Sequence, residues 1–180
     1  MKLLRCLAIM AGLAAAPATA QTPVTYVDDG APLFTVTVPD FWTVRTGGIR
    51  EITDKRLGEP RVVGRVIGLR PENDDSAWMG FVSPDGVATF EDGRNYLREI
   101  ANFMASDPVV SDRVKTRIGG RSAEVIRATG RRNGRFLNIT ATLIDLPGSR
   151  MAMAFAVLEG GGDPGYVDEM NDVFSSFRAR

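Results

Sequence analysis

The first twenty residues have the pattern of a secretory signal peptide, and residues 21–180 contain neither histidine nor cysteine. Lys2 and Arg5 give the positive start, an uncharged apolar run covers residues 7–16, and Ala18-Thr19-Ala20 supplies the small side chains of a cleavage site. We expect cleavage before Gln21 and a periplasmic or secreted protein. The exported chain must then fold without a disulfide, a cysteine nucleophile or the usual zinc ligands.

The exported segment is long enough for one domain that buries its own core. We expect residues 21–32, which are rich in turn-forming residues, to be a loose leader, and residues 33–180 to form a single domain. Cys6 precedes the apolar run, whereas the cysteine of a lipid anchor follows it, so no lipid anchor is expected. No later apolar run approaches the ~20 residues that span a bilayer, so we expect no transmembrane segment after cleavage.

Hydrophobic periodicity divides the rest of the chain into strands and two helices. Thr89 followed by Asp92 is typical of a capping box that starts a helix, and Asp163-Pro164 is typical of a second helix start. The run 151–158 is apolar at both its odd and its even positions, which predicts a central strand covered on both faces. Strands are predicted over residues 33–38, 41–44, 62–69, 77–82, 112–118, 122–131, 135–146 and 151–158. This order predicts an α+β domain in which helices flank an antiparallel sheet.

Three short motifs resemble a known family. They are Thr37-Val38-Pro39-Asp40-Phe41-Trp42, the run from Arg117 to Ala123, and Phe174-Ser175-Ser176-Phe177-Arg178. With them the chain resembles the PsbP-like α/β/α sandwich superfamily, which includes photosystem II extrinsic proteins and bacterial periplasmic proteins of unknown role. The resemblance implies an α/β/α sandwich with an accessory or binding role, and it brings no shared catalytic motif to this chain.

Positive charge is concentrated in one stretch of the sequence. The whole chain has 22 basic and 22 acidic residues, and loss of Lys2 and Arg5 with the signal peptide leaves a net charge of −2. Residues 113–135 carry eight basic residues against Glu124 alone, a local charge of +7, so the rest of the exported chain has −9. This asymmetry makes the stretch the strongest electrostatic feature of the protein.

The turns on either side of the strand 122–131 predict how these charges are arranged. A three-residue loop at Gly119-Gly120-Arg121 and a tight turn at Asn133-Gly134 both place the apolar residues of the hairpins on one face. A two-residue Gly-Gly turn would instead pair Lys115 with Glu124, and it is the less favoured alternative. The predicted cationic face consists of Arg113, Lys115, Arg117 and Arg127, bordered at the hairpin tip by Arg131, Arg132 and Arg135.

Two interpretations of this cationic face stay open. It is either a partner-binding surface or a face without a partner, which is solvated or has its cations paired with Asp168, Glu169 and Asp172 of the last helix. Trp42 and Trp78 likewise either pack in the core or line a ligand pocket. The acidic runs 72–75 and 28–29 are interpreted as solvated turns rather than calcium sites.

The leading functional hypothesis is a non-enzymatic exported binding or accessory protein that engages an anionic envelope component or an acidic protein through the basic hairpin. The alternatives are a carboxylate- or serine/lysine-dependent hydrolase and a carrier of a small apolar ligand. No cofactor, metal or nucleic acid is expected, because the sequence has no motif that would hold one.

Overall fold

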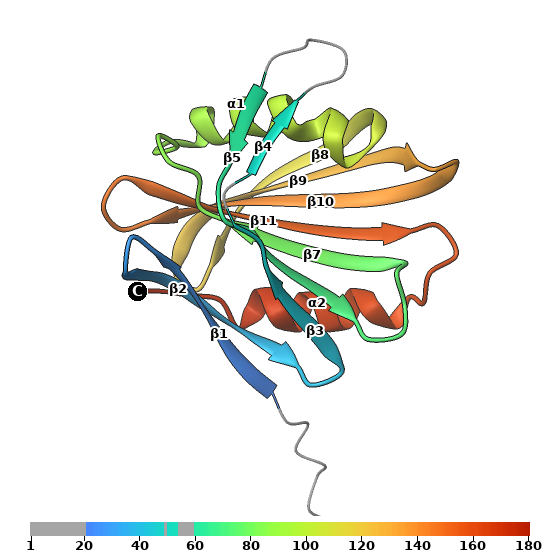
Figure 1. Cartoon of the computed structure of the whole chain (residues 1–180), viewed down its shortest axis with the longest axis horizontal. Coiled ribbons are helices and arrows are strands. Elements are labelled where there is room, and N and C mark those ends of the chain that lie inside the picture. The colour runs from blue at the N-terminus through green and yellow to red at the C-terminus, as the bar shows by residue number, and fades with distance from the viewer. Residues whose placement is uncertain (1–20, 49, 54–59) are drawn as a thin grey trace, which may run out of the picture.

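A seven-stranded antiparallel sheet forms the centre of the molecule (Figure 1). The structure is a computed structural model that describes residues 21–48, 50–53 and 60–180, so the expected signal peptide lies outside the described residues. Across the sheet the strands are β3 (Trp42–Thr46), β6 (Ile67–Pro71), β7 (Ala77–Val82), β11 (Arg150–Glu159), β10 (Arg135–Leu146), β9 (Arg121–Arg132) and β8 (Ser106–Ile118). The antiparallel sheet confirms the predicted fold class.

The two helices cover opposite faces of this sheet, as the top and bottom of Figure 1 show. Helix α1 (Phe90–Met104) packs on a cluster that contains Met151, Met153 and Phe155. Helix α2 (Gly165–Ser175) packs on the cluster that contains Ala152 and Ala154. Because neighbouring residues of β11 alternate between the two clusters, β11 is covered on both faces, as its run of apolar residues predicted. Within the described residues, neither helix combines the length and apolarity needed to cross a bilayer.

The N-terminal segment 21–32, expected to be a loose leader, is instead ordered. It forms β1 (Gln21–Asp28) and the start of β2 (Ala31–Pro39). On the α2 side of the molecule β1 pairs with β2, and β2 pairs on its other edge with β12 (Arg178–Ala179). Tyr26 is buried and stacks on Phe34 with 4.8 Å between the ring centroids. The turn residues that suggested a loose leader make a tight hairpin turn, with Asp29 and Gly30 both at positive φ.

The segment 62–69, predicted as one strand, is divided in two. Residues 60–63 belong to β5 (Pro60–Val63), which pairs with β4 (Arg50–Thr53), and β6 begins only at Ile67. Residues 64–66 between them are outside any strand. The hairpin of β6 and β7 that the sequence predicts is present.

The start of α1 follows the predicted chemistry, whereas α2 starts one residue later than predicted, with Pro164 rather than Asp163 as its N-cap. The Thr89 side chain accepts a hydrogen bond from the Asp92 N–H, and the Asp92 carboxylate accepts one from the Thr89 N–H. The Thr89 hydroxyl and the Thr89 N–H both donate to the Asp92 carboxylate, and these two bonds lower the pKa of Asp92. At α2 the Asp163 carboxylate accepts a hydrogen bond from the Gly165 N–H at 2.8 Å, so it satisfies one of the free N–H groups at the helix start.

Candidate functional site

The turn between β8 and β9 has two residues, not three. Lys115 lies opposite Glu124, and Arg113 lies opposite Ile126. The favoured three-residue loop was therefore wrong, and the Gly-Gly alternative is correct. Gly119 and Gly120 have φ of +55° and +79°, the positive values that a two-residue hairpin turn requires. The Asn133-Gly134 hairpin has the predicted register, with Ile126 opposite Ala141.

This one-residue difference divides the predicted cationic face. Arg113, Lys115 and Arg117 share the α1 side of the sheet, because Arg113 pairs with Ile126 of the α1-side cluster. Arg127 alternates with Ile126 along β9 and therefore lies on the opposite side. The prediction that these four cations form one surface is wrong.

Most of the predicted cations contact carboxylates or carbonyl groups of nearby strands rather than of α2. Arg127 pairs with Asp112 at 2.6 Å, Arg113 pairs with Glu124 at 3.2 Å, and the Arg117 guanidinium donates to the Gly120 carbonyl. Within the part of the chain that the structure describes, the side chains of Lys115 and Arg131 make no hydrogen bond or ion pair. The expected pairing with Asp168, Glu169 and Asp172 is not formed by the described residues, and Glu169 instead accepts a hydrogen bond from the buried Trp42 indole.

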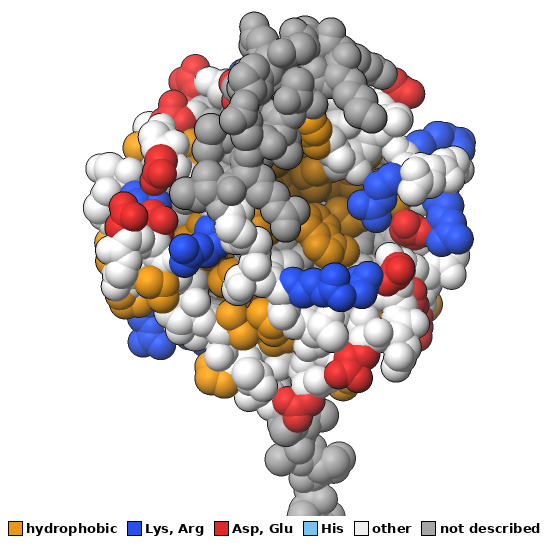
Figure 2. Space-filling model, viewed as in Figure 1, with side chains coloured by type: hydrophobic (Ala, Val, Ile, Leu, Met, Phe, Trp, Pro, Cys, Tyr) orange, Lys and Arg blue, Asp and Glu red, His pale blue; other side chains and the backbone are white. Residues whose placement is uncertain are grey.

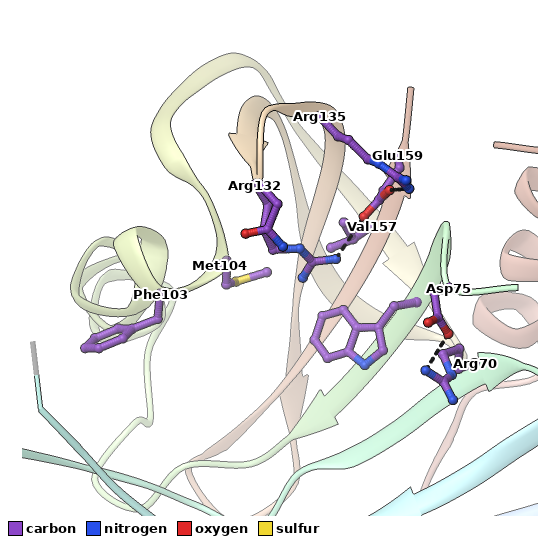
Figure 3. A pocket seen from close by; sticks show the side chains of 10 residues that line it. Arg70, Asp75, Phe103, Met104, Arg132, Arg135, Val157 and Glu159 are labelled. Atoms are coloured by element: carbon purple, nitrogen blue, oxygen red, sulfur yellow. Dashed lines mark hydrogen bonds and ion pairs between the residues drawn. The ribbon is translucent and has the colours of Figure 1, made fainter. Parts of the chain in front are cut away.

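Residues of the β9–β10 hairpin tip line a pocket of about 680 Å³, which we call the hairpin-tip pocket. The volume lies in the range of roughly 300–1,000 Å³ typical of small-molecule sites. Figure 3 shows Arg132 and Arg135 entering from the hairpin and Arg70 from the opposite side. Figure 2 shows an apolar hollow to the right of centre with basic side chains around it. The pocket is lined by Arg70, Asp75, Trp78, Phe103, Met104, Arg132, Asn133, Arg135, Val157 and Glu159.

One carboxylate is shared by two arginines in this pocket. Glu159, at the end of β11, pairs with Arg135 at 2.7 Å and with Arg132 at 3.5 Å. The hydrogen bond from Arg135 holds the pKa of Glu159 below its ordinary value, and the same bond raises the pKa of Arg135. These three side chains therefore keep a net charge of +1. Across the pocket Arg70 pairs with the exposed Asp75 at 2.5 Å.

Trp78 lies against a glycine surface on the sheet. A Cβ on Gly80 would come within 2.7 Å of the indole, and one on Gly68 would come within 3.5 Å. The Gly80 contact would be a clash, so the indole can lie there only because Gly80 lacks a side chain, whereas the Gly68 distance is an ordinary van der Waals contact. Trp78 is partly buried and also lines the hairpin-tip pocket, so core packing and pocket lining, posed as alternatives, are both realised.

Two other chemistries considered from the sequence, a serine–lysine pair and a metal site, are not formed by the described residues. Lys115, the one lysine among them, has no hydrogen bond to a serine, so the serine–lysine arrangement is absent there. The described residues also include no group of three or more acidic side chains placed to hold a metal ion.

Comparison with known proteins shows the fold alone. No known sequence family matches the chain, and no curated protein sequence matches it. The solution structure of cyanobacterial PsbP (CyanoP) from Synechocystis sp. PCC 6803 is similar to it with a TM-score of 0.51 and 11% identity, over 95% of this chain and 98% of that one. The chain therefore has a PsbP-like fold, as the three short motifs predicted.

Two further structures are similar at lower scores. LpqN of Mycobacterium tuberculosis, described as involved in cell envelope biogenesis, has a TM-score of 0.44 and 17% identity over 89% of this chain and 90% of its own. A protein of unknown function from Pseudomonas aeruginosa has a TM-score of 0.45 and 14% identity over 86% and 94%. Both scores are too low to define a shared fold.

Proposed function

We propose that the chain is an exported, non-enzymatic binding or accessory protein that engages an anionic envelope component through the hairpin-tip pocket. The observation that carries this proposal is the convergence of Arg70, Arg132 and Arg135 on one pocket that also has an aromatic wall, Trp78. Export rests on the signal-peptide pattern, and the mass of the exported protein tests it, because cleavage before Gln21 defines one expected value.

The guanidinium groups at the pocket have donors to spare for an anion. Each guanidinium has five N–H donors, whereas Glu159 takes one hydrogen bond from Arg135 and stands 3.5 Å from Arg132. A phosphate or carboxylate matches the planar fork of arginine and can accept two parallel bonds from it. The apolar floor of Met104, Val157 and Trp78 would contact the uncharged part of the same ligand.

The hairpin-tip pocket replaces the broad cationic face as the proposed contact surface. Arg132 and Arg135 belong to the predicted tip cluster and line the pocket, and Arg131 precedes them on β9. Arg113, Lys115, Arg117 and Arg127 do not line it. An acidic protein partner, the other possibility raised by the sequence, becomes an outcome of the test.

Co-sedimentation with vesicles tests the proposal. Vesicles of phosphatidylcholine with and without phosphatidylglycerol should separate charge-dependent binding from other binding. We expect binding only to the anionic vesicles, weakening as salt is raised because screening reduces exposed charge contacts. The double variant Arg132→Gln/Arg135→Gln should lose most of this binding.

The matched control is Arg117→Gln/Arg127→Gln, which removes the same charge from strands outside the pocket. It should bind like the native protein. Equal loss in both double variants would mean that net charge rather than the pocket determines binding, and it would overturn the proposal. Binding to a polyglutamate peptide but not to anionic vesicles would assign the site to an acidic protein instead.

A further inference from the structure

A second pocket lies between helix α1 and the β8 edge of the sheet. It has a volume of about 550 Å³ and is lined by residues of α1, β8, β9, β10 and β11. We call it the helix–sheet groove. Its inner wall is apolar and buried, and consists of Ile126, Ile139, Ala141 and Phe155 together with the half-buried Ala128.

The path of α1 explains why the groove exists. Near its start the helix approaches the sheet closely at Gly93, where a Cβ would come within 3.0 Å of the Leu143 side chain. Gly93 is the one fully buried residue of the helix. Later turns place Leu97, Ala101 and Met104 along the groove, where Leu97 and Met104 also pack against the edge of the core. The glycine therefore lets one end of the helix contact the sheet, while the space beside the other end stays open.

Three arginines stand at the rim of the groove. Arg94 and Arg98 come from α1, and Arg113 comes from β8. The buried carboxylate of Glu124 on β9 holds two of them, with Arg94 at 3.0 Å and Arg113 at 3.2 Å. Arg98 contacts the Asn95 side chain on the same helix. Three positive charges against one buried negative charge leave a net charge of +2 at the rim.

We propose that the helix–sheet groove binds an anionic amphiphile with one alkyl chain, such as a fatty acid or a lysophospholipid. The alkyl chain lies against the apolar inner wall, where its burial is favourable. The carboxylate or phosphate lies at the three arginines, which supply charge-assisted hydrogen bonds. An uncharged apolar ligand would not use the +2 rim, and a cationic one would be repelled by it.

The groove is a different site from the hairpin-tip pocket, although Met104 contributes to both. The rim arginines Arg94, Arg98 and Arg113 do not line the hairpin-tip pocket, and Arg132 and Arg135 do not line the groove. Loss of one activity can therefore be distinguished from loss of the other by separate variants.

Isothermal titration with saturated fatty acids below their micellar concentrations tests the chain requirement. Each added methylene should tighten the dissociation constant about threefold to fourfold until the apolar wall is filled. The alcohol of equal chain length should bind more weakly than the acid. Lysophosphatidic acid with the same chain forms a second arm, and it shows which of the two head groups the rim prefers.

Arg98→Gln tests the rim without disturbing Glu124, because Arg98 does not contact that carboxylate. It should weaken binding of the acid several-fold and leave binding of the alcohol unchanged. Lys115→Gln is the matched control. Lys115 is a cation on β8 that lies opposite Glu124 in the sheet but does not line the groove. Equal effects of the two variants, or none from Arg98→Gln, would overturn the assignment of the head group.

Ala101→Trp tests the cavity itself. Ala101 is half-buried on α1, so a larger side chain there fills the groove from the helix side with little effect on the core. We expect loss of fatty-acid binding with an unchanged unfolding transition. Undiminished binding in this folded variant, affinity independent of chain length, or loss of binding in Arg132→Gln/Arg135→Gln would overturn the groove as the binding site.

Discussion

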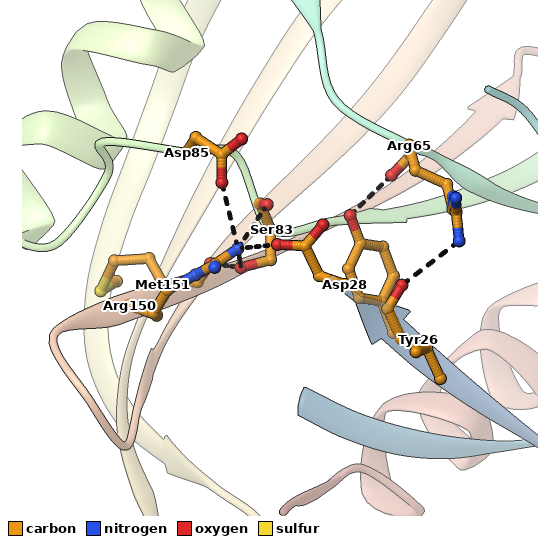
Figure 4. Close-up of polar contacts among 8 residues, drawn as sticks. Tyr26, Asp28, Arg65, Ser83, Asp85, Arg150 and Met151 are labelled. Carbon is orange, nitrogen blue, oxygen red and sulfur yellow. Dashed lines mark hydrogen bonds and ion pairs between the residues drawn. The ribbon is translucent and has the colours of Figure 1, made fainter. Parts of the chain in front are cut away.

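Asp28 and Arg150 are separated by 122 residues in the chain, and their side chains form an ion pair of 2.6 Å (Figure 4). Asp28 ends β1 and Arg150 begins β11, so the pair connects the N-terminal hairpin to the central sheet. The same guanidinium donates to the Ser83 carbonyl at 3.2 Å, just after β7. One side chain therefore joins three segments that are far apart in sequence.

Replacing Arg150 with methionine should destabilise the protein by about 1–3 kcal/mol, because the partly buried Asp28 carboxylate and the Ser83 carbonyl lose a donor. Urea unfolding measures the change. Arg45→Met is the control, since Arg45 is exposed and has no side-chain hydrogen bond or ion pair within the described residues. Its effect should stay within about 0.5 kcal/mol. Similar values for the two variants would show that the contacts of Arg150 do not hold the N-terminal hairpin.

Two tyrosines differ in whether the hydroxyl has a partner. The Tyr26 hydroxyl donates to the Arg65 carbonyl at 2.8 Å, so Tyr26→Phe should cost about 1 kcal/mol. The Tyr96 hydroxyl is buried without a hydrogen-bond partner among the described residues, so Tyr96→Phe should be neutral or stabilising. Thermal unfolding of both variants checks the contrast. A clear loss of stability in Tyr96→Phe would reveal a hydroxyl contact that the structure lacks.

Burial raises the pKa of Tyr96 to about 12. Tyrosine ionises near pH 10 when it is exposed, so the absorbance change from Tyr96 should come at distinctly higher pH. The difference between the alkaline titrations of the native protein and of Tyr96→Phe isolates this step. A Tyr96 step close to pH 10 would contradict the burial of its hydroxyl.

Glu159 should contribute to stability at neutral pH and lose that contribution in acid. Because Arg135 lowers the pKa of folded Glu159 below the ordinary 4.5, the unfolded chain binds the proton more readily. The contribution is therefore fully present above the unfolded pKa and disappears as pH falls through the folded pKa. Glu159→Gln should be less stable than the native protein near pH 7, and the difference should vanish in stronger acid.

The urea unfolding midpoints of the native protein and of Glu159→Gln, measured from pH 7 into stronger acid, test this pH dependence. Glu72→Gln is the control, since Glu72 is exposed and its side chain has no hydrogen bond or ion pair among the described residues. Its pH dependence should match that of the native protein. A constant difference between Glu159→Gln and the native protein at all pH values would mean that the ion pair does not stabilise the fold through charge.

The features that the sequence predicted correctly depend on neighbouring residues or on the alternation of side chains along a strand. The capping box of Thr89 and Asp92, the Asn133-Gly134 turn and the doubly covered strand β11 each follow from a short segment. The fold class follows from the order of these elements. Arg132 and Arg135, which the sequence placed at the hairpin tip, line a pocket that the sequence did not predict.

The features that the sequence did not predict depend on distant contacts. The order of segment 21–32 comes from Tyr26 stacking on Phe34 and from the Asp28–Arg150 pair. The hairpin-tip pocket brings together Arg70, Trp78 and Arg135, which lie on three different strands. The helix–sheet groove arises from the angle of α1, and no local pattern encodes that angle. The sequence argument assumed that the apolar residues of β8 and β9 share one face of the sheet. Ile118 instead packs on the α2 side and Ile126 on the α1 side, so this assumption favoured the wrong β8–β9 register.

Substitution of Gly119 and Gly120 tests the two-residue turn between β8 and β9. Both have positive φ, which costs an L-residue about 1–2 kcal/mol, but they differ in their surroundings. A Cβ on Gly120 would meet nothing within 4 Å, whereas one on Gly119 would come within 2.4 Å of the Phe177 carbonyl oxygen. Gly120→Ala should therefore cost about 1–2 kcal/mol, and Gly119→Ala about 3 kcal/mol or more, because backbone must also move. Urea unfolding of the two variants gives the comparison, and equal costs would contradict the close approach of this turn to the end of α2.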